Sequence, residues 1–561
     1  MPLRFAERAS EAYHPPLIIR HLLETALITS AEQEIIYRDR HRYSYREFAG
    51  RIGRLASLLE QCGARQGMTI AMLDWDSHRY LEAYFAIPMM GAVLQTANVR
   101  MPVPQLAYTL QHAKAEILVV HRDFFPMIEE ILPSLIGVKA VIAIMDGAEE
   151  ALPSYACGEY ELLSALASPD YPFQDFDENA VATTFYTTGT TGTPKGVCFT
   201  HRQIVLHTLA TTGPFGGSDW TDGFGFGDVY MPMTPMFHVH AWGVPYMATL
   251  LGVKQVYPGR YEPEILCAMR DAHGVTYSHC VPTILQMIFQ AADASGIDLG
   301  GWKITVGGSA MSKTLCAEAR RRGMKVHAGY GMSETAPTIC ITHARLDEQG
   351  DEEKLLETLT ATGVPVPMVQ ARIVDEAMNP MPHDGMTRGE LVLRAPWLTP
   401  CYTGDAAASE ALWRGGWLHT QDVATIDERG YIRIRDRLKD VIKTGGEWID
   451  SIQLEDLLGQ AQGVAEAAVI AVPDAKWGER PLAVIVPEPE ALPTLEVLNV
   501  PVAAAIAAGA ITRYARLERF ELVDRLPRTS VGKIDKKLLR ERYAEPCEVA
   551  AQPRDLSHGK K

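Results

Sequence analysis

A segment rich in threonine and glycine is the feature that most constrains how this chain can fold. It reads Thr184-Phe-Tyr-Thr-Thr-Gly-Thr-Thr-Gly-Thr-Pro-Lys-Gly-Val197. Glycines let backbone N–H groups approach an anion closely, hydroxyls add further donors, and Lys195 adds a positive charge. The segment therefore predicts a loop that binds a polyphosphate.

The residues on either side of this loop are typical of regular structure, which argues against a flexible linker. Residues 181–185 and 197–199 have the composition of strands. Thr200 and Gln203 have the spacing of a capping box that opens an apolar helix over residues 204–210. The pattern Gly-x-x-Gly-x-x-Lys-Gly differs from a Walker A loop, which has four residues between its first glycine and Gly-Lys-Ser/Thr. We expect a phosphate loop of another class, held between two strands.

Length and composition set the broad class of protein. A chain of 561 residues is too long for one compact core, so at least two domains are expected. The net charge of −16 argues against non-specific nucleic-acid binding, which needs a basic surface. Nine cysteines without a Cys-x-x-Cys motif predict reduced thiols in a cytoplasmic protein.

The sequence shows no pattern of a targeting or membrane-spanning segment. The N-terminus, Met-Pro-Leu-Arg-Phe-Ala-Glu-Arg, lacks the apolar core of a signal peptide. No apolar run reaches the roughly 18 residues that a membrane span requires. We expect no transmembrane segment, and contact with a membrane surface stays open.

Runs typical of buried strands alternate with helical patterns through the first part of the chain. Strands are expected at residues 35–37, 68–73, 91–95, 117–120 and 141–144, with helices ending near residue 59 and covering 78–91. This alternation predicts an α/β fold whose parallel sheets are covered by helices on both faces. Residues 1–30 are expected to form a leader, and the glycine-rich residues 213–227 a surface loop.

Two further segments carry residue types suited to a nucleotide and a ligand. In His327-Ala-Gly-Tyr-Gly-Met-Ser-Glu-Thr335, the ring of Tyr330 lies between glycines and can stack on a base. Glu334 offers the hard oxygen ligands that suit Mg²⁺. Small residues at 278–283 and 306–310 follow predicted strands and leave volume for a ligand.

Two histidines stand in the apolar run of residues 231–242. His238 and His240, at i and i+2, would face the same side of a strand, an arrangement that zinc sites use. No third ligand with suitable spacing is near, so we reject zinc. We expect His240 to be a packed core residue.

Together these segments resemble the adenylate-forming superfamily, which includes acyl-CoA synthetases, luciferases and the adenylation domains of peptide synthetases. The resemblance extends over roughly residues 30–540 and is nearest to medium- and long-chain fatty acyl-CoA ligases. It implies a large N-terminal domain of parallel-rich sheets flanked by helices, residues 1–435, and a hinge at residues 436–439. A small mobile α+β C-terminal domain, residues 440–545, and a flexible tail, residues 546–561, would follow.

The resemblance also implies which residues bind the nucleotide. Asp422, in Trp417-Leu-His-Thr-Gln-Asp, would accept the ribose hydroxyls, although Gln421 stands where glycine is usual. The implied ATP- and AMP-binding residues are Thr187, Thr188, Gly189, Thr190, Thr191, Gly192, Thr193, Lys195, Gly308, Ser309, Ala328, Gly329, Tyr330, Gly331, Ser333, Asp422 and Arg437.

The remaining implied roles concern the acid, CoA and the metal. Lys533, in the segment of residues 526–534, resembles the catalytic lysine of the family, and His238 and Glu334 would act with it. Glu334 and Thr187 would hold Mg²⁺. The acyl pocket and its gate would be formed by His238, Trp242, Val281, Gly307 and Gly308. The thioester step would use Lys439, Lys443, Gly445 and Gly446.

The implied activity is an AMP-forming carboxylic acid–CoA ligase that uses ATP, Mg²⁺ and coenzyme A. A run of the form Phe-His-x-x-Ala-Trp, ending at Trp242, favours a fatty or related apolar acid. The alternatives are an enzyme that passes the acyl group to a carrier protein or oxidises it as luciferases do, and a non-catalytic binding relative. The chain length, with no appended carrier segment, argues only against loading of a carrier in the same chain. We expect the partners to be a small-molecule carboxylic acid, ATP and CoA, and no nucleic acid. A homodimer and the physiological direction of the reaction stay open.

Overall fold

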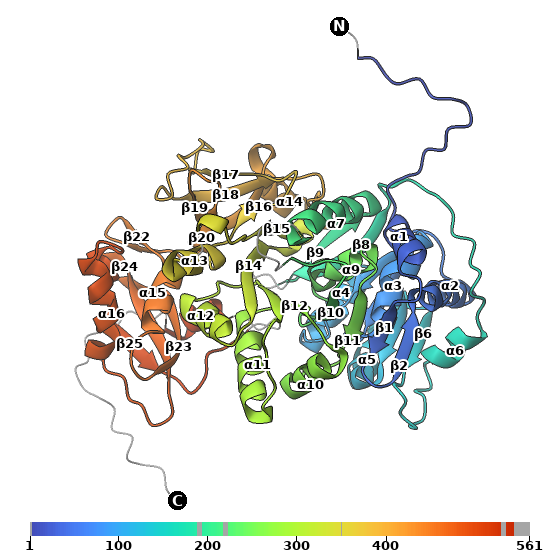
Figure 1. The fold of residues 1–561 in the computed structure, drawn as a ribbon, viewed down its shortest axis with the longest axis horizontal. Helices are drawn as coiled ribbons and strands as arrows, with labels where there is room; N and C mark the ends of the chain where they lie inside the picture. The colour runs from blue at the N-terminus through green and yellow to red at the C-terminus, as the bar shows by residue number, and fades with distance from the viewer. Residues whose placement is uncertain (1–2, 188–192, 217–222, 349, 529–533, 544–561) are drawn as a thin grey trace, which may run out of the picture. The chain divides into compact units, whose positions relative to one another are not determined.

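The computed structural model describes residues 3–187, 193–216, 223–348, 350–528 and 534–543. The chain divides into two compact units, one of residues 1–420 and 425–433, the other of residues 421–424 and 434–561. Figure 1 gives the order of the elements along the chain. The main division, between Arg433 and Ile434, lies two residues before the expected end of the N-terminal domain.

The first large sheet of unit 1 has seven strands in the order β7-β6-β5-β3-β4-β8-β9. All neighbouring strands are parallel except β8 and β9, which form an antiparallel pair. Every residue of β3 and β6 is buried, as expected for parallel strands covered on both faces. The strands are β3 (Thr69–Leu73), β4 (Val93–Thr96), β5 (Ala115–His121), β6 (Ala140–Ile144), β7 (Gly158–Glu159), β8 (Val181–Thr187) and β9 (Lys195–Thr200).

The second large sheet has nine strands in the order β16-β15-β14-β13-β12-β10-β11-β1-β2. Its central strands are parallel, so the carboxyl ends of β10, β12, β13 and β14 lie along one edge, where open α/β sheets bind ligands. The strands are β1 (Glu34–Tyr37), β2 (His41–Ser44), β10 (Val229–Pro232), β11 (Lys254–Tyr257), β12 (Tyr277–Cys280), β13 (Lys303–Val306), β14 (Lys325–Gly331), β15 (Thr338–Ile341) and β16 (Val364–Pro365).

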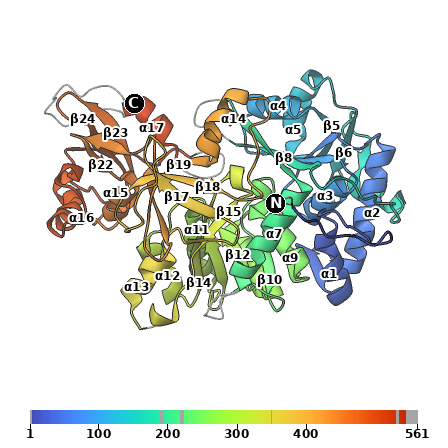
Figure 2. The same cartoon turned by 90° about the horizontal axis from the view of Figure 1, so that it is seen from above.

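Helix α3 (His78–Met89) is buried along its whole length because it contacts strands of both large sheets (Figure 2). The remaining helices of this unit include α7 (His201–Gly216), which contacts β9 of the first large sheet and β15 of the second. The others are α1 (His21–Thr29), α2 (Tyr45–Gln61), α4 (Val103–His112), α5 (Phe125–Ile131), α6 (Tyr160–Leu166), α8 (Val239–Trp242), α9 (Val244–Leu250), α10 (Pro263–His273), α11 (Pro282–Ser295), α12 (Lys313–Arg321), α13 (Glu352–Leu359) and α14 (Ala406–Leu412).

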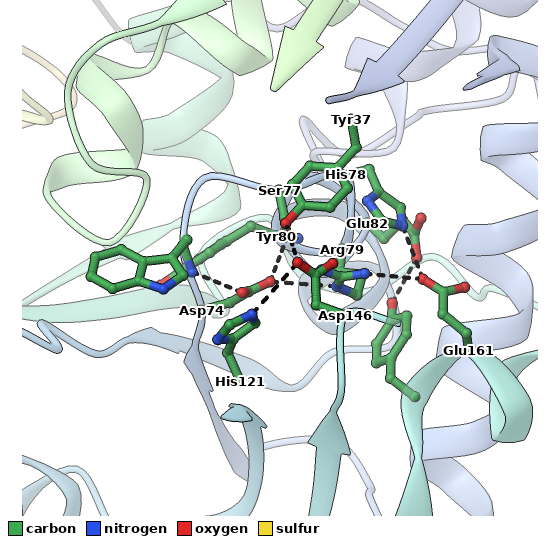
Figure 3. A network of polar contacts seen from close by, with 12 residues as sticks. Tyr37, Asp74, Ser77, His78, Arg79, Tyr80, Glu82, His121, Asp146 and Glu161 are labelled. Atoms are coloured by element: carbon green, nitrogen blue, oxygen red, sulfur yellow. Dashed lines mark hydrogen bonds and ion pairs between the residues drawn. The ribbon is translucent and has the colours of Figure 1, made fainter. Parts of the chain in front are cut away.

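The first turn of α3 carries charged side chains into the interior of unit 1 (Figure 3). Arg79 is 1% exposed, and its guanidinium nitrogens lie 3.0 Å from Asp146 and 3.4 Å from Glu161. Glu82, which has no exposed surface, accepts hydrogen bonds from Tyr160 at 2.6 Å and from Arg51 at 2.6 Å. Buried charges are tolerated only when paired in this way, so this network fixes how α3 lies between the sheets.

A four-stranded sheet, in the order β17-β18-β19-β20, follows where the chain passes from unit 1 to unit 2. Unit 2 then forms a sheet in the order β22-β21-β24-β23, with β25 beside β24, and cores around Leu454 and Leu482. The elements are β17 (Gln370–Val374), β18 (Gly389–Arg394), β19 (Leu418–Ile426), β20 (Ile432–Arg437), β21 (Ile442–Thr444), β22 (Glu447–Ile449), α15 (Ser451–Leu458), β23 (Val464–Asp474), β24 (Gly478–Pro487), α16 (Leu495–Ala507), β25 (Arg519–Leu522) and α17 (Lys536–Tyr543).

The predicted class, a large α/β part with parallel-rich sheets and a smaller α+β part after it, is confirmed. Some local expectations were wrong. Residues 21–29, expected in a leader, form α1 and bury Leu22 and Ala26, because the segment has enough apolar residues for one packed face. In the part of the chain that the structure describes, no helix has the length and hydropathy needed to span a bilayer.

The glycine-rich stretch of residues 213–227 is anchored at both ends and is not simply a surface loop. Helix α7 continues through Gly216, past the expected end at residue 210. Phe224 is 1% exposed, its ring centroid lies 4.4 Å from that of Tyr277, and its backbone N–H donates to Phe215. Aromatic packing therefore outweighs the glycine content here. Residues 217–222 lie outside the described residues.

Candidate active site

The β8–β9 hairpin brings the two ends of the threonine- and glycine-rich loop together. Thr187, the last residue of β8, is the register partner of Lys195, the first of β9. Thr200 and Gln203 exchange the two hydrogen bonds of the predicted capping box at the start of α7. Thr193 is exposed beside Lys195. The predicted phosphate ligands Thr188, Gly189, Thr190, Thr191 and Gly192 lie outside the described residues.

A tyrosine joins this hairpin to the segment that follows β14. The hydroxyl of Tyr402 donates to a carboxylate oxygen of Glu334 at 2.5 Å. The ammonium of Lys195 lies 4.7 Å from the centroid of the Tyr402 ring. Val197 and Tyr402 form an antiparallel bridge, which holds the tyrosine beside β9. A cation from β9 thereby contacts the ring of this tyrosine, and a carboxylate from the short helix after β14 contacts its hydroxyl.

Glu334 and Thr187 fit the predicted binding of Mg²⁺ in their chemistry. Glu334 is 6% exposed, so its carboxylate is largely withdrawn from water. Tyr402 bonds one carboxylate oxygen, and no other described side chain donates to Glu334. Carboxylate and hydroxyl oxygens are the ligands that Mg²⁺ prefers.

The other predicted nucleotide and acyl ligands lie at the carboxyl ends of the parallel strands. Val281 follows β12, and Gly307, Gly308 and Ser309 follow β13. Gly308 and Ser309 are exposed, whereas Gly307 is buried. The predicted residues on or just after β14 are Ala328, Gly329, Tyr330, Gly331 and Ser333.

Two of these glycines are required by close backbone approaches. A Cβ at Gly331 would lie 1.9 Å from the carbonyl oxygen of Pro337. A Cβ at Gly307 would lie 2.7 Å from the carbonyl oxygen of Gly329 and 3.0 Å from the indole ring of Trp242. The predicted gate, Trp242, therefore lies directly against the predicted acyl pocket at Gly307.

Trp242 is carried on a left-handed turn. Val239, His240, Ala241 and Trp242 have φ angles of 50°, 53°, 47° and 62°. The left-handed region costs non-glycine residues about 1–2 kcal/mol each. The expectation that the two histidines share one face of a strand was therefore wrong, since β10 ends at Pro232. His238 precedes the turn and is half-buried.

Hydrogen bonds to the seven-stranded sheet hold the segment before Trp242 in place. Asp76 accepts from the backbone N–H of Met236 at 2.8 Å, and Thr96 donates to the carbonyl of Phe237 at 2.9 Å. His240, which is 1% exposed, bonds the hydroxyl of Thr183 at 2.8 Å. Burial lowers the pKa of His240 to about 3, so it is neutral. Its predicted role as a packed core residue is confirmed.

Burial also shifts the titration of two groups near this segment. It raises the pKa of Asp76 to about 8, against the lowering effect of hydrogen bonds from Tyr261 and Met236. It lowers the pKa of His279 to about 3. The His279 ring lies 5.0 Å from that of Trp242 and bonds Tyr230 and Thr234 through its two nitrogens. A neutral, fixed imidazole therefore supports the indole.

In unit 2, the predicted ribose ligand and its neighbour form an ion pair. A guanidinium nitrogen of Arg437 lies 2.8 Å from a carboxylate oxygen of Asp422, which is 2% exposed. Gln421 has a φ of 62° and its carbonyl accepts from the backbone N–H of Leu438. Glutamine thus adopts a left-handed conformation within β19, at the position where glycine is usual.

The predicted thioester residues lie around the β21–β22 hairpin of unit 2. Lys443 is exposed in β21, and its ammonium lies 5.3 Å from the ring centroid of Trp448. Gly445 and Gly446 form the two-residue turn with φ angles of 60° and 87°, a conformation that favours glycine at both positions. Lys439 is exposed before β21. The predicted catalytic residue Lys533 lies outside the described residues.

One residue of the predicted hinge is firmly held within unit 2. Asp436 is 1% exposed and accepts at 2.6 Å from the backbone N–H of Ser451, at the start of α15. Burial raises the pKa of Asp436, and the nearby Lys536 opposes that rise.

Among the described residues, one cluster of histidine and acidic side chains has ligand atoms within 4.8 Å of one another, namely His41, His78 and Glu161. Glu161 already accepts from His78 at 2.9 Å and from Arg51 at 2.8 Å. Hydrogen bonds and charges from these partners lower the pKa of Glu161 against the effect of burial. Two nearby guanidinium groups would repel a metal cation, so we assign the cluster a structural role.

Several residues that shape the site were missed by sequence reasoning. Tyr402 and Asp76 stand in segments without a recognisable motif, and His279 was read only as part of a small-residue stretch. Their importance depends on contacts between distant segments. A spacing rule within one segment does not reveal such contacts.

The chain matches two family profiles. The profile of the AMP-binding enzyme family matches residues 23–403, and that of the AMP-binding enzyme C-terminal domain matches residues 453–533. The chain is 40% identical over 533 residues to a long-chain-fatty-acid–CoA ligase of Thermus thermophilus, covering 93% of this chain and 94% of that protein. It is 35% identical over 548 residues to a 3-methylmercaptopropionyl-CoA ligase of Ruegeria lacuscaerulensis, covering 94% and 98%.

A solved structure supports the fold. The anthranilate CoA ligase AuaEII in complex with anthranoyl-AMP superimposes with a TM-score of 0.82, at 21% identity, over 94% of this chain and 98% of that one.

Proposed function

The chain belongs to the AMP-binding enzyme family, and from that premise we propose that it joins a fatty or related apolar carboxylic acid to coenzyme A. It is an AMP-forming acid–CoA ligase, with ATP and CoA as its other substrates. What we propose is the class of acid, the residues that act on it, and the use of Mg²⁺.

The observation that carries the assignment of residues is the arrangement of Lys195, Tyr402 and Glu334. The Lys195 ammonium lies 4.7 Å from the centroid of the Tyr402 ring, and the Tyr402 hydroxyl donates to a carboxylate oxygen of Glu334 at 2.5 Å. A phosphate-binding cation and a metal-binding carboxylate are both needed where the triphosphate reacts.

In the first half-reaction, the substrate carboxylate attacks the α-phosphate of ATP and expels pyrophosphate. Negative charge grows on the phosphate oxygens, so Lys195 and the loop hydroxyls stabilise the transition state from the β8–β9 side. Mg²⁺ held by Glu334 and Thr187 would neutralise charge on the phosphates. Lys533 is proposed to contact the reacting carboxylate. Asp422 and Arg437 are proposed to bind the ribose and the phosphate.

In the second half-reaction, the CoA thiol attacks the carbonyl of the acyl-adenylate and releases AMP. Pantetheine must occupy space that the first arrangement fills, so we propose that the C-terminal domain, residues 440–545, rotates about the hinge at residues 436–439. Lys439, Lys443, Gly445 and Gly446 are proposed to act at this stage. The exposed position of the β21–β22 turn agrees with such a role.

An apolar acid is favoured by the surroundings of Trp242. The indole lies against Gly307 and over the neutral His279, so this wall offers an apolar surface without a charge. The relatives named as long-chain and medium-chain fatty-acid–CoA ligases, at 40% and 33% identity, favour the same class. Val281 and His238 are proposed to border this acid.

Two further parts of the proposal concern the cellular compartment and the oligomeric state of the enzyme. We propose a reducing compartment such as the cytoplasm, because the eight cysteines in the described ranges are all free. We also propose a homodimer, and sedimentation of the purified protein tests that point.

The test is AMP release by purified protein with ATP, Mg²⁺ and CoA across straight-chain, branched, aromatic and thioether acids, run in both directions. We expect AMP and acyl-CoA in equal amounts with medium or long apolar acids. AMP without acyl-CoA would favour transfer to a carrier protein or oxygenation. No AMP with any acid would overturn the proposal.

A further inference from the structure

We propose that Cys198 and Cys401 form a redox-sensitive modification site beside the phosphate loop, where a peroxide converts the two thiols into a reversible disulfide. Cys198 lies in β9, three residues after Lys195. Cys401 immediately precedes Tyr402. Neither cysteine takes part in the proposed ligase chemistry.

The backbone places the two cysteines opposite each other. Val197 and Tyr402 form an antiparallel bridge, and the backbone N–H of Thr403 donates to the carbonyl of Gly196 at 2.8 Å. One step along each strand from the bridge brings Cys198 opposite Cys401. Directly opposed residues in antiparallel strands have Cα atoms about 4.5–5.5 Å apart. Disulfides span Cα separations of about 4.4–6.8 Å, so the register allows the bond.

The side chains themselves interact. Burial is the main reason that the pKa of the Cys198 thiol rises to about 11. The charge interaction and the hydrogen bond between Cys198 and Cys401 add to that rise. Thr403 also bonds the Cys198 thiol and opposes the rise. Opposed cysteines in antiparallel strands point to the same face, so the two sulfur atoms meet without a change of strand register.

The exposure of the pair suits a small oxidant. Cys198 and Cys401 are both half-buried, whereas Cys267, Cys280 and Cys340 are buried. A peroxide can therefore reach this pair more readily than those core thiols.

The chemistry balances with one peroxide for each disulfide. Because its high pKa keeps Cys198 a thiol at neutral pH, reaction begins at Cys401, whose sulfur attacks the O–O bond of hydrogen peroxide and becomes a sulfenic acid as water leaves. The sulfur of Cys198 then attacks the sulfenic sulfur, the S–O bond breaks and a second water leaves. The two thiols have lost two electrons to the peroxide. A dithiol reverses the reaction by exchange.

The disulfide would act on the neighbouring site through the backbone. An S–S bond has a fixed length and dihedral geometry, so the backbone at Cys401 must adjust its position against β9 to form it. Tyr402 follows Cys401 and holds both Glu334 and Lys195 in place. A displacement of about 1 Å at such a position can cost up to about 100-fold in rate. We expect a 3- to 30-fold slower adenylation half-reaction after oxidation. This second part rests on the proposed function.

The test begins with the full-length reduced protein and stoichiometric hydrogen peroxide, followed by digestion without reductant and mass spectrometry. We expect a cross-linked peptide pair containing Cys198 and Cys401, with a loss of two hydrogens, that disappears after treatment with dithiothreitol. Absence of the cross-link under conditions that oxidise the exposed Cys157 would overturn the proposal.

Matched variants separate the modification from its effect. Cys198→Ser and Cys401→Ser should each abolish the cross-link and make pyrophosphate exchange resistant to peroxide, whereas Cys62→Ser, remote from the site, should behave as the wild type. Equal peroxide sensitivity of Cys198→Ser and the wild type would overturn the regulatory role. The cross-link is measured without substrates, so this result does not depend on whether ligase activity is found.

Discussion

The Tyr402 hydroxyl donates a 2.5 Å hydrogen bond to Glu334, which places the buried carboxylate beside the start of β9. The two residues are 68 positions apart in the chain. Because the Tyr402 ring also lies under the Lys195 ammonium, one side chain sets the separation between a candidate metal ligand and a candidate phosphate ligand.

Tyr402→Phe removes the hydroxyl and keeps the ring. Hydrogen bonds to charged groups contribute about 1.5–3 kcal/mol, so we expect kcat/KM for MgATP in pyrophosphate exchange to fall about 10- to 100-fold. Tyr171→Phe is the matched control, because its hydroxyl bonds Glu60 on the exposed surface. An unchanged kcat/KM in Tyr402→Phe would contradict the positioning role of the hydroxyl.

Arg437→Ala removes the cation that pairs with the buried Asp422. The carboxylate then loses this cation and the proposed nucleotide site loses a positive charge, so we expect KM for ATP to rise at least about 10-fold. Isothermal titration with ATP measures the affinity directly. Arg519→Ala, which breaks the half-buried pair with Glu521 in the same unit, should leave it unchanged.

Asp76→Asn should alter how stability depends on pH. Burial raises the pKa of Asp76 to about 8 in the folded protein, above its usual value near 4. The folded protein therefore keeps a proton that the unfolded chain has lost, and the free energy of unfolding falls as pH rises from about 4 to 8. The variant lacks this titration, so wild type should lose about 1.4 kcal/mol per pH unit relative to it between these two pKa values. Urea unfolding at pH 5, 6, 7 and 8 measures the difference. A constant difference would show that Asp76 is ionised in the folded state.

Glu161→Gln tests the buried network of Figure 3. The carboxylate lies within 3.4 Å of Arg79, which is 1% exposed, and within 2.8 Å of Arg51. Removing its charge leaves these cations less well compensated, and we expect the free energy of unfolding to fall by about 2–4 kcal/mol. Exposed Glu149→Gln is the control. Since we assign the cluster no metal, Zn²⁺ should change the melting temperatures of the wild type and Glu161→Gln by the same amount, and a shift confined to the wild type would refute that assignment.

Lys533→Ala should separate the two half-reactions. The lysine is proposed to stabilise charge only while the acid attacks ATP. Pyrophosphate exchange should therefore be lost, whereas thioester formation from a prepared acyl-adenylate and CoA should be retained. Equal loss of both steps would refute this division of roles.

The sequence predicted those features that depend on local patterns. Alternating strand and helix signals predicted the α/β class, because parallel strands buried on both faces have continuous apolar runs, as in β3 and β6. Thr200 and Gln203 predicted the capping box, because its two hydrogen bonds join residues three apart.

Features that depend on distant contacts could not be predicted in this way. Nothing around Cys401 or Tyr402 indicates that this segment pairs with β9. The histidines near Trp242 suggested a strand, but hydrogen bonds from Asp76 and Thr96 fix a different path for the backbone. The pKa of Asp76 is raised because segments distant in the sequence bury its carboxyl group. The residues next to Asp76 in the sequence do not indicate this burial.

The left-handed turn at Val239–Trp242 has a consequence for efforts to engineer this protein. Non-glycine residues are strained there, so selection for heat resistance alone would favour glycine at Val239 or Ala241. Glycine would also loosen the indole that lies against Gly307. Variants of this protein selected only for thermal stability would thus accept a broader range of acids. Substrate discrimination should therefore be measured in every round of selection.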